Sequence, residues 1–299
     1  MATEPPDILH TVTIKAPGPV CSTLAELLEI RGAAPSVWLS PDKQTGAVTL
    51  YYPTAEEASK EHAALQDYLG KLTTVVPADT CEITTGRIQR EDWADAWKHH
   101  FHTARVSERL VVTPQSEPYQ ALPGDVVITI WPGMAFGTGL HATTRACLKF
   151  LDWITKDYNA TTMLDIGTGS GVLAIAAAKL GCEKVDAFDH DAGAVNVAEQ
   201  NCRENRVDQR INVFEADVRT FRPDQRYDIV AANLLCTLVV HNADVLSACV
   251  RPGGHILLSG ILEEQYDLAH AAFSERGFAQ QQSLTMEGWT SGWFIGPEG

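Results

Sequence analysis

The second half of the chain alternates short apolar runs with stretches of helical character. The apolar runs are "TTMLDI", "KVDAF", "RINVFEA", "YDIVAAN" and "GGHILLSG". Continuous apolar runs are typical of strands that are buried on both faces, and a helical run is expected after each of them. Strands that alternate with helices predict an α/β fold with a parallel sheet covered by helices on both faces. Two last runs, "FAQQQSLTM" and "GWFIGP", predict a hairpin that closes the sheet.

The first 88 residues have a different order of signals. "ILHTVTIKA" predicts a strand, "STLAELLEIRG" a helix between Ser22 and Gly32, and "SVWLSPDKQTGAVTLYYP" a hairpin. A second helix is expected in "TAEEASKEHAALQDYLG", opened by a capping box of Thr54 and Glu57 and ended by Gly70, and "TCEITTGRI" predicts a last strand. The order β-α-β-β-α-β predicts a smaller, ferredoxin-like α+β domain over residues 1–88.

Residues 89–104 are expected to form a linker helix before a larger domain at residues 105–299. Trp93, Trp97 and Phe101 recur at helical spacing, so this helix needs an apolar surface to pack on. The nearby histidines point in different directions on a helix, and we expect no metal site from His99, His100 and His102.

Charge and cysteine usage limit the functional classes. Over 299 residues the formal net charge is −15, which argues against a nucleic-acid surface and is compatible with a basic protein partner. The seven cysteines include no Cys-x-x-Cys pair, and the N-terminus lacks the regions of a signal peptide. No apolar run approaches the roughly 20 residues that cross a bilayer. These features predict a cytoplasmic protein without membrane contact.

A glycine loop separates the first of the apolar strands from its helix. Gly167, Gly169 and Gly171 allow a sharp turn and let a ligand approach bare backbone, although a tight turn without a ligand would use the same residues. A dinucleotide-binding fingerprint requires glycine where Val172 stands. The loop therefore favours a compact cofactor without a pyrophosphate, with Asp165 as an anion near a cationic or amino group.

Three polar residues follow later strands of the same sheet. Asp189 ends the next strand, 22 residues beyond Gly167, where a carboxylate can accept both hydroxyls of a ribose. Asp217 is placed to meet an adenine amino group, or is a solvated loop aspartate. Asn233 ends the fourth strand at the edge where open α/β sheets bind ligands, or caps the following helix.

These motifs, in this order, resemble the class I methyltransferases that use S-adenosylmethionine. The motifs "EDWADAWKHHF", "PGMAFGTGLHATT", "LDIGTGSGVLAIAAAKLG", "AANLL" and "LSGIL" resemble more narrowly the bacterial ribosomal protein L-eleven methyltransferases. The resemblance runs from about residue 88 to the end. It implies a Rossmann-like methyltransferase sheet for the larger domain. The chain departs from the family at Trp131, where an acidic residue is usual, and at His190–Ala192, which lacks the usual proline.

The resemblance also implies roles for individual residues. In the family, the residues that match Thr144, Gly167, Asp189 and Asn233 bind S-adenosylmethionine. The first Gly-Thr-Gly, at residues 137–139, would be a pliable loop beside the cofactor, with Phe136 covering an apolar methyl or adenine face. The expected cofactor residues are therefore Phe136, Thr144, Asp165, Gly167, Gly169, Gly171, Asp189, Asp217 and Asn233, of which Asn233 also has a catalytic role.

The activity implied is methylation of the N-terminal α-amine and lysine side chains of the large-subunit ribosomal protein, gripped by the N-terminal domain. Two alternatives remain: a methyltransferase for another protein lysine or a small amine, and a non-catalytic adaptor that binds an adenosine cofactor. We expect a monomer that binds neither metal nor nucleic acid.

Overall fold

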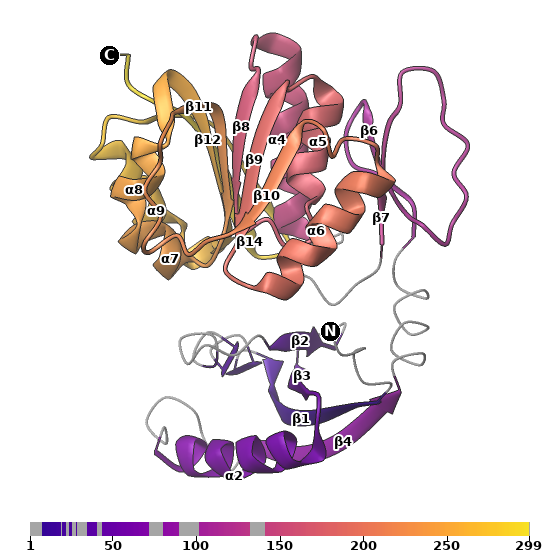
Figure 1. Cartoon of the computed structure of the whole chain (residues 1–299). Helices are drawn as coiled ribbons and strands as arrows, with labels where there is room; N and C mark the ends of the chain where they lie inside the picture. Colours follow the sequence, from indigo (N-terminus) through magenta and orange to yellow (C-terminus); the bar gives the residue numbers. More distant parts are fainter. Residues whose placement is uncertain are drawn as a thin grey trace. The chain divides into compact units, whose positions relative to one another are not determined.

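The computed structural model describes residues 8–18, 20–21, 24–25, 28, 35–40, 44–71, 80–89, 102–131 and 141–298. The chain divides into two compact units, Met1–Trp97 and Lys98–Gly299 (Figure 1). The tryptophan stripe of the expected linker helix lies outside the described residues, as do His99 and His100.

The N-terminal unit is an antiparallel sheet with a helix on one face. Its elements are β1 (Ile8–Pro17), β2 (Ser36–Leu39), β3 (Thr45–Tyr52), α2 (Ala55–Lys71) and β4 (Glu82–Gln89). The strand order is β2-β3-β1-β4, and every pair is antiparallel. This order confirms the ferredoxin-like layout predicted from the sequence.

Alternating side chains build the core of this unit. Val12, Ile14, Val48 and Leu50 point to one face of the sheet and pack in one cluster with Leu65 of α2. Cys21, Leu24 and Leu28, which are helical, are buried in the same cluster. The bounds of the helix predicted between β1 and β2, Ser22 and Gly32, lie outside the described residues.

The predicted capping box opens α2. The backbone N–H of Glu57 donates to Thr54 Oγ1, and the backbone N–H of Thr54 donates to Glu57 Oε2, both at 3.2 Å. The helix continues to Lys71, one residue beyond the predicted stop at Gly70.

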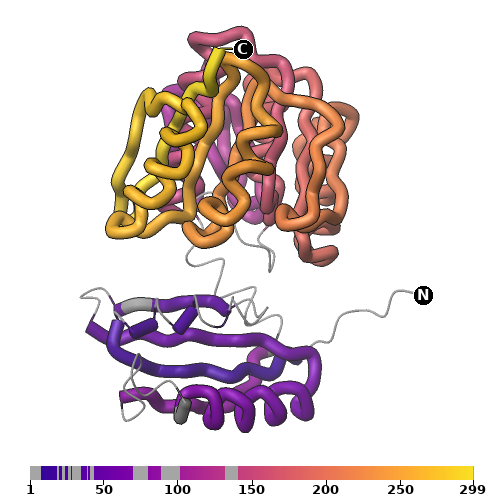
Figure 2. The backbone as a smooth tube through the Cα atoms, turned by 90° about the vertical axis from the view of Figure 1, so that its left-hand side faces the viewer, coloured from indigo at the N-terminus to yellow at the C-terminus, as the bar shows by residue number. Residues whose placement is uncertain are grey.

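The C-terminal unit contains the predicted α/β sheet. Its strands are β8 (Thr162–Ile166), β9 (Lys184–Asp189), β10 (Ile211–Glu215), β11 (Tyr227–Asn233), β12 (Val250–Leu262), β13 (Ala279–Met286) and β14 (Trp289–Ile295). Their order is β10-β9-β8-β11-β12-β14-β13. The first five strands of this order are parallel, whereas β14 is antiparallel to both of its neighbours. The predicted hairpin of β13 and β14 forms one margin of the sheet (Figure 2).

Helices cover both faces of this sheet. They are α4 (Ala142–Asp157), α5 (Val172–Leu180), α6 (Ala192–Glu204), α7 (Cys236–His241), α8 (Ala243–Ala248) and α9 (Tyr266–Ser274). Figure 1 shows α4, α5 and α6 on one face and α7, α8 and α9 on the other. The prediction of a helix after β10 was wrong, because residues 216–226 form turns, bends and irregular backbone. This segment includes Pro223 and has no apolar stripe that a helix could bury.

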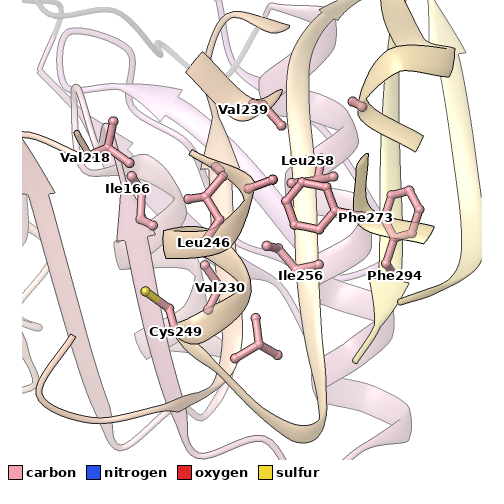
Figure 3. Close-up of a cluster of buried hydrophobic side chains, with 14 of the residues drawn as sticks. Ile166, Val218, Val230, Val239, Leu246, Cys249, Ile256, Leu258, Phe273 and Phe294 are labelled. Carbon is pink, nitrogen blue, oxygen red and sulfur yellow. The ribbon is translucent and has the colours of Figure 1, made fainter. Parts of the chain in front are cut away.

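A large apolar cluster lies between the sheet and the helices α7, α8 and α9 (Figure 3). Val230, Ile256 and Leu258 contribute side chains from the central strands, and Phe273 of α9 and Phe294 of β14 pack against them. All five are fully buried. Burial of a side chain of this size stabilises the fold by about 1.5–3 kcal/mol, so the cluster holds the strand ends that carry the polar loops.

A small sheet of β5 (Ala104–Arg105), β6 (Leu110–Pro114) and β7 (Val126–Ile130) lies beside α5 and α6. Asn205, the C-cap of α6, fixes β7, because its Oδ1 accepts the N–H of Thr129 and its Nδ2 donates to the carbonyl of Thr129. In the part of the chain that the structure describes, no helix is long and apolar enough to span a membrane.

Candidate cofactor site

The glycine loop lies between the end of β8 and the start of α5. Gly167, Gly169 and Gly171 have φ values of 71°, 54° and 81°, in the left-handed region that favours glycine. A Cβ on Gly167 would lie 2.5 Å from Leu234 Cδ2. The loop therefore needs glycine both for its backbone conformation and for its contact with the segment after β11.

Asp165 holds this loop from the end of β8. Its Oδ2 accepts a hydrogen bond from Thr168 Oγ1 at 2.7 Å and another from the N–H of Ala174 at 3.2 Å. The carboxyl is fully buried, and burial raises its pKa to about 6, against the effect of these two hydrogen bonds. Asp165 thus links the loop to the first turn of α5. Its predicted contact with the cofactor stays a prediction.

Asp189 joins the glycine loop to the end of β9. Its Oδ2 accepts the N–H of Gly169 at 2.9 Å, and its Oδ1 accepts the N–H of Asp191 at 3.1 Å. A carboxylate has about four acceptor positions, so further donors can bind the same group. The structure therefore brings the loop and the carboxylate expected for the ribose into direct contact.

Asn233 and Thr144 meet on the other side of the loop. The Nδ2 group of Asn233, at the end of β11, donates to Thr144 Oγ1, in the first turn of α4, at 3.5 Å. Asn233 Oδ1 is buried and accepts no hydrogen bond from any residue that the structure describes. The alternative capping role is wrong, because α7 begins after Leu235, two residues beyond Asn233. A buried acceptor without a partner fits a ligand that brings an N–H or O–H donor.

Asp217 follows β10, the strand next to β9. The guanidinium of Arg219 binds both of its carboxylate oxygens, with Nε 2.9 Å from each. Mainly through this hydrogen bonding, Arg219 lowers the pKa of Asp217 to about 2. Asp217 is therefore ionised and paired, and an adenine amino group would share it with Arg219. The adenine contact stays a prediction.

Part of the expected site lies outside the described residues: Phe136 and the first Gly-Thr-Gly at 137–139. The helix α4 follows them, and His141 is its N-cap, because Nδ1 of His141 accepts the N–H of Thr143 at 3.4 Å. Trp131, where the chain departs from the family pattern, is exposed at the end of β7.

Sequence reasoning missed Asn201 of α6. This side chain is fully buried, and its Nδ2 donates to the carbonyl of Ser170 in the glycine loop at 2.8 Å. Its Oδ1 accepts the N–H of Trp131 at 2.9 Å. Asn201 therefore braces the loop against the end of β7. The only signal in the sequence was an asparagine at a position of α6 that faces the protein interior.

The sheet and the site together define a class of protein. The strand order, the antiparallel β14 and the glycine loop after the central β8 make this unit a class I methyltransferase fold. Its polar residues gather at the carboxyl ends of β8, β9 and β11, where ligands of open α/β sheets bind.

Comparisons with known proteins identify the family. The family model described as "Ribosomal protein L11 methyltransferase (PrmA)" matches residues 24–293. A Geobacter metallireducens protein named "Ribosomal protein L11 methyltransferase" is 36% identical over 294 residues, which cover 93% of this chain and 95% of that protein. A Geobacter sulfurreducens protein of the same name is 38% identical over 240 residues, 79% of this chain and 77% of that protein. The chain belongs to the ribosomal protein L11 methyltransferase family.

A solved structure agrees with this membership. The crystal structure of ribosomal protein L11 methylase from Lactobacillus delbrueckii subsp. bulgaricus matches with a TM-score of 0.60 at 28% sequence identity. The match covers 67% of this chain and 100% of that chain.

Proposed function

We propose that this protein is an S-adenosylmethionine-dependent methyltransferase that methylates ribosomal protein L11. Membership of the family supports both the proposed reaction, methyl transfer, and the proposed substrate, L11. The observation that carries the cofactor site is the contact between Asp189 and the backbone of Gly169 at 2.9 Å. It combines a bare glycine backbone with a carboxylate at the end of the next strand.

The residues present fit the cofactor. The left-handed glycines of the loop present bare backbone to the amino-acid part, and the carboxylate of Asp189 has further acceptor positions for ribose hydroxyls. S-adenosylmethionine supplies a methyl group that is already activated on a sulfonium, so the protein mainly has to position a neutral nucleophile in line with it.

Asn233 is the residue that we propose to touch the substrate amine. A free lysine amine has a pKa of about 10.4, roughly 3 units above neutral pH, so it has to lose a proton before it can attack. Loss of water around the amine, next to a sulfonium, favours the neutral form. The Oδ1 of Asn233 then accepts an amine N–H and points the nitrogen lone pair toward the methyl group.

The finer specificity is also a proposal. We propose that the N-terminal α-amine and lysine side chains of L11 are the acceptors, and that the domain at residues 1–88 grips the substrate, with residues 89–104 as the linker to the methyltransferase domain at 105–299. We propose that the reaction takes place in the cytoplasm, because the proposed substrate is a ribosomal protein. We expect a monomer that needs no nucleic acid for the transfer.

Mass spectrometry tests the proposed function directly. Purified protein, S-adenosylmethionine and L11 should give L11 that carries added methyl groups on the N-terminal peptide and on lysine peptides. L11 from cells that lack the protein should lack these methyl groups. An L11 that gains no methyl group, while another protein in the extract does, would move the activity to a different substrate. Cofactor binding without transfer to any protein would favour an adaptor.

A further inference from the structure

One motif of the sequence, "LSGIL", has no part in the site described above. It ends β12, and its Ser259 is the register partner of Asn233 in the neighbouring β11. The carbonyl of Ser259 accepts the N–H of Leu234 at 3.0 Å. Ser259 therefore lies directly beside the strand end that carries Asn233.

The side chain of Ser259 reaches a second part of the site. Its Oγ donates to the carbonyl of Thr143 at 3.2 Å, in the first turn of α4 and next to Thr144. Its Oγ also lies 2.6 Å from Ser291 Oγ in β14. Thr143, Ser259 and Ser291 are each 1% exposed or less, so no bulk water competes for these groups.

The chemistry of the three groups sets the direction of the hydrogen bonds that join Ser291, Ser259 and Thr143. A carbonyl can only accept, and a hydroxyl has a single hydrogen. Ser259 can therefore satisfy Thr143 only if the hydrogen between the two serines comes from Ser291. The Ser291 hydroxyl therefore donates to Ser259 Oγ, and the Ser259 hydroxyl donates to the carbonyl of Thr143. Ser259 is the member that touches α4.

Gly260 brings the same strand close to the site. Its φ is 78°, and a Cβ there would overlap the backbone carbonyl oxygen of Leu234. The Ser-Gly pair thus makes two close contacts, one with the segment after Asn233 and one with the helix turn of Thr144.

We infer that Ser259 is a positioning residue, which fixes Thr144 relative to Asn233 for cofactor binding. The inference rests on the proposed function, since it concerns the same cofactor. Neither Ser259 nor Ser291 is among the residues assigned to the cofactor. The Asn233–Thr144 contact is long, at 3.5 Å, so it holds the two elements together weakly by itself. The bond from Ser259 to the backbone of Thr143 is the stronger tie.

Three hydroxyl deletions separate positioning from stability. Ser259→Ala removes the bond to α4, Ser291→Ala leaves that bond in place, and Thr290→Val removes a buried hydroxyl that pairs with Thr285 at 2.8 Å within the hairpin. Each variant loses a hydrogen bond, so all three should lower the melting temperature. Only Ser259→Ala should raise the Kd for S-adenosylhomocysteine, by about five- to tenfold, the ratio that corresponds to one hydrogen bond.

Calorimetric titration well below the melting temperatures measures this Kd. If Ser259→Ala fails to fold, Ser259→Cys takes its place, because its thiol is a weaker donor in the same position. Its Kd should still exceed that of the unmodified protein, but by less than the roughly five- to tenfold rise expected for alanine. A Ser259 variant that binds no more weakly than Thr290→Val would overturn the positioning role. If the unmodified protein itself does not bind S-adenosylhomocysteine or S-adenosylmethionine, the proposed function fails instead, and the positioning role fails with it.

Discussion

The Oδ2 atom of Asp189 lies 2.9 Å from the backbone nitrogen of Gly169, so one carboxylate belongs both to the glycine loop and to the end of the neighbouring strand. A ligand that binds this carboxylate is therefore coupled to the conformation of the loop. A change at either residue affects both.

Asp189→Asn tests the carboxylate. An amide retains the size of the side chain but has one acceptor oxygen in place of two, so the loop contact and the ribose contact compete for it. The Kd for S-adenosylmethionine should rise by about 10- to 100-fold, the range of charge-assisted hydrogen bonds. Calorimetry measures it, with exposed Asp224→Asn as the matched control. An unchanged Kd in a folded variant would remove Asp189 from the ribose site.

Gly167→Ala tests whether the loop needs space as well as a left-handed backbone. The added Cβ would meet Leu234 at 2.5 Å, whereas at Gly124, with a φ of 91°, no described atom lies within 4 Å of it. Both variants carry the backbone strain of about 1–2 kcal/mol. Only Gly167→Ala should also weaken cofactor binding, because its loop has to shift. Equal losses of stability and no loss of affinity in either variant would contradict this interpretation.

The buried carboxyl of Asp165 predicts a pH dependence of stability. Its pKa is raised from 3.8 to about 6 in the folded chain, because burial disfavours the ionised form. A group with a raised folded pKa binds its proton more tightly in the folded state, so it adds stability at low pH and loses that contribution as the pH rises through 6. Between pH 7.5 and pH 5 the protein should therefore gain about 1 kcal/mol of unfolding free energy relative to Asp165→Asn.

Urea unfolding of both proteins at the two pH values measures this gap. The difference between them cancels the contributions of all other titrating groups that the substitution leaves unchanged. Asp224→Asn is again the control, and it should show no comparable change of the gap. A gap that stays constant, or that moves in the opposite direction, would mean that the pKa of Asp165 is not raised in the folded chain.

The sequence predicted the sheet well because its strands have a local signature. Residues 229–232, in the middle of β11, are apolar throughout, and such a run is typical of a strand buried on both faces. The helix expected after β10 failed for the complementary reason, since residues 216–226 followed a strand but carried no apolar stripe. The alternation of strands and helices along the chain predicted a helix there, but the side chains of this segment lack the apolar stripe that a helix would bury.

The site was predictable only as far as its residues mark a strand end or a turn. Asp189 and Asn233 end strands, and their position at one sheet edge follows from that alone. Asn201 and Ser259 were not predicted, because their roles depend on contacts with residues 31 and 116 positions away. No local pattern reports which distant backbone group a buried polar side chain will meet.

Asn233→Ala should lower the chemical rate more than it weakens cofactor binding. The side chain gives only a long hydrogen bond to Thr144, so its removal costs the cofactor pocket little, whereas its unpartnered Oδ1 is the acceptor proposed for the substrate amine. Loss of one preorganised polar group typically lowers the rate by about 10²-fold. Single-turnover kinetics at saturating cofactor isolates this step, and Thr144→Val is the matched control, because it removes the partner of Nδ2 and leaves Oδ1 in place. A near-normal rate with greatly weakened cofactor binding would assign Asn233 to the cofactor pocket alone.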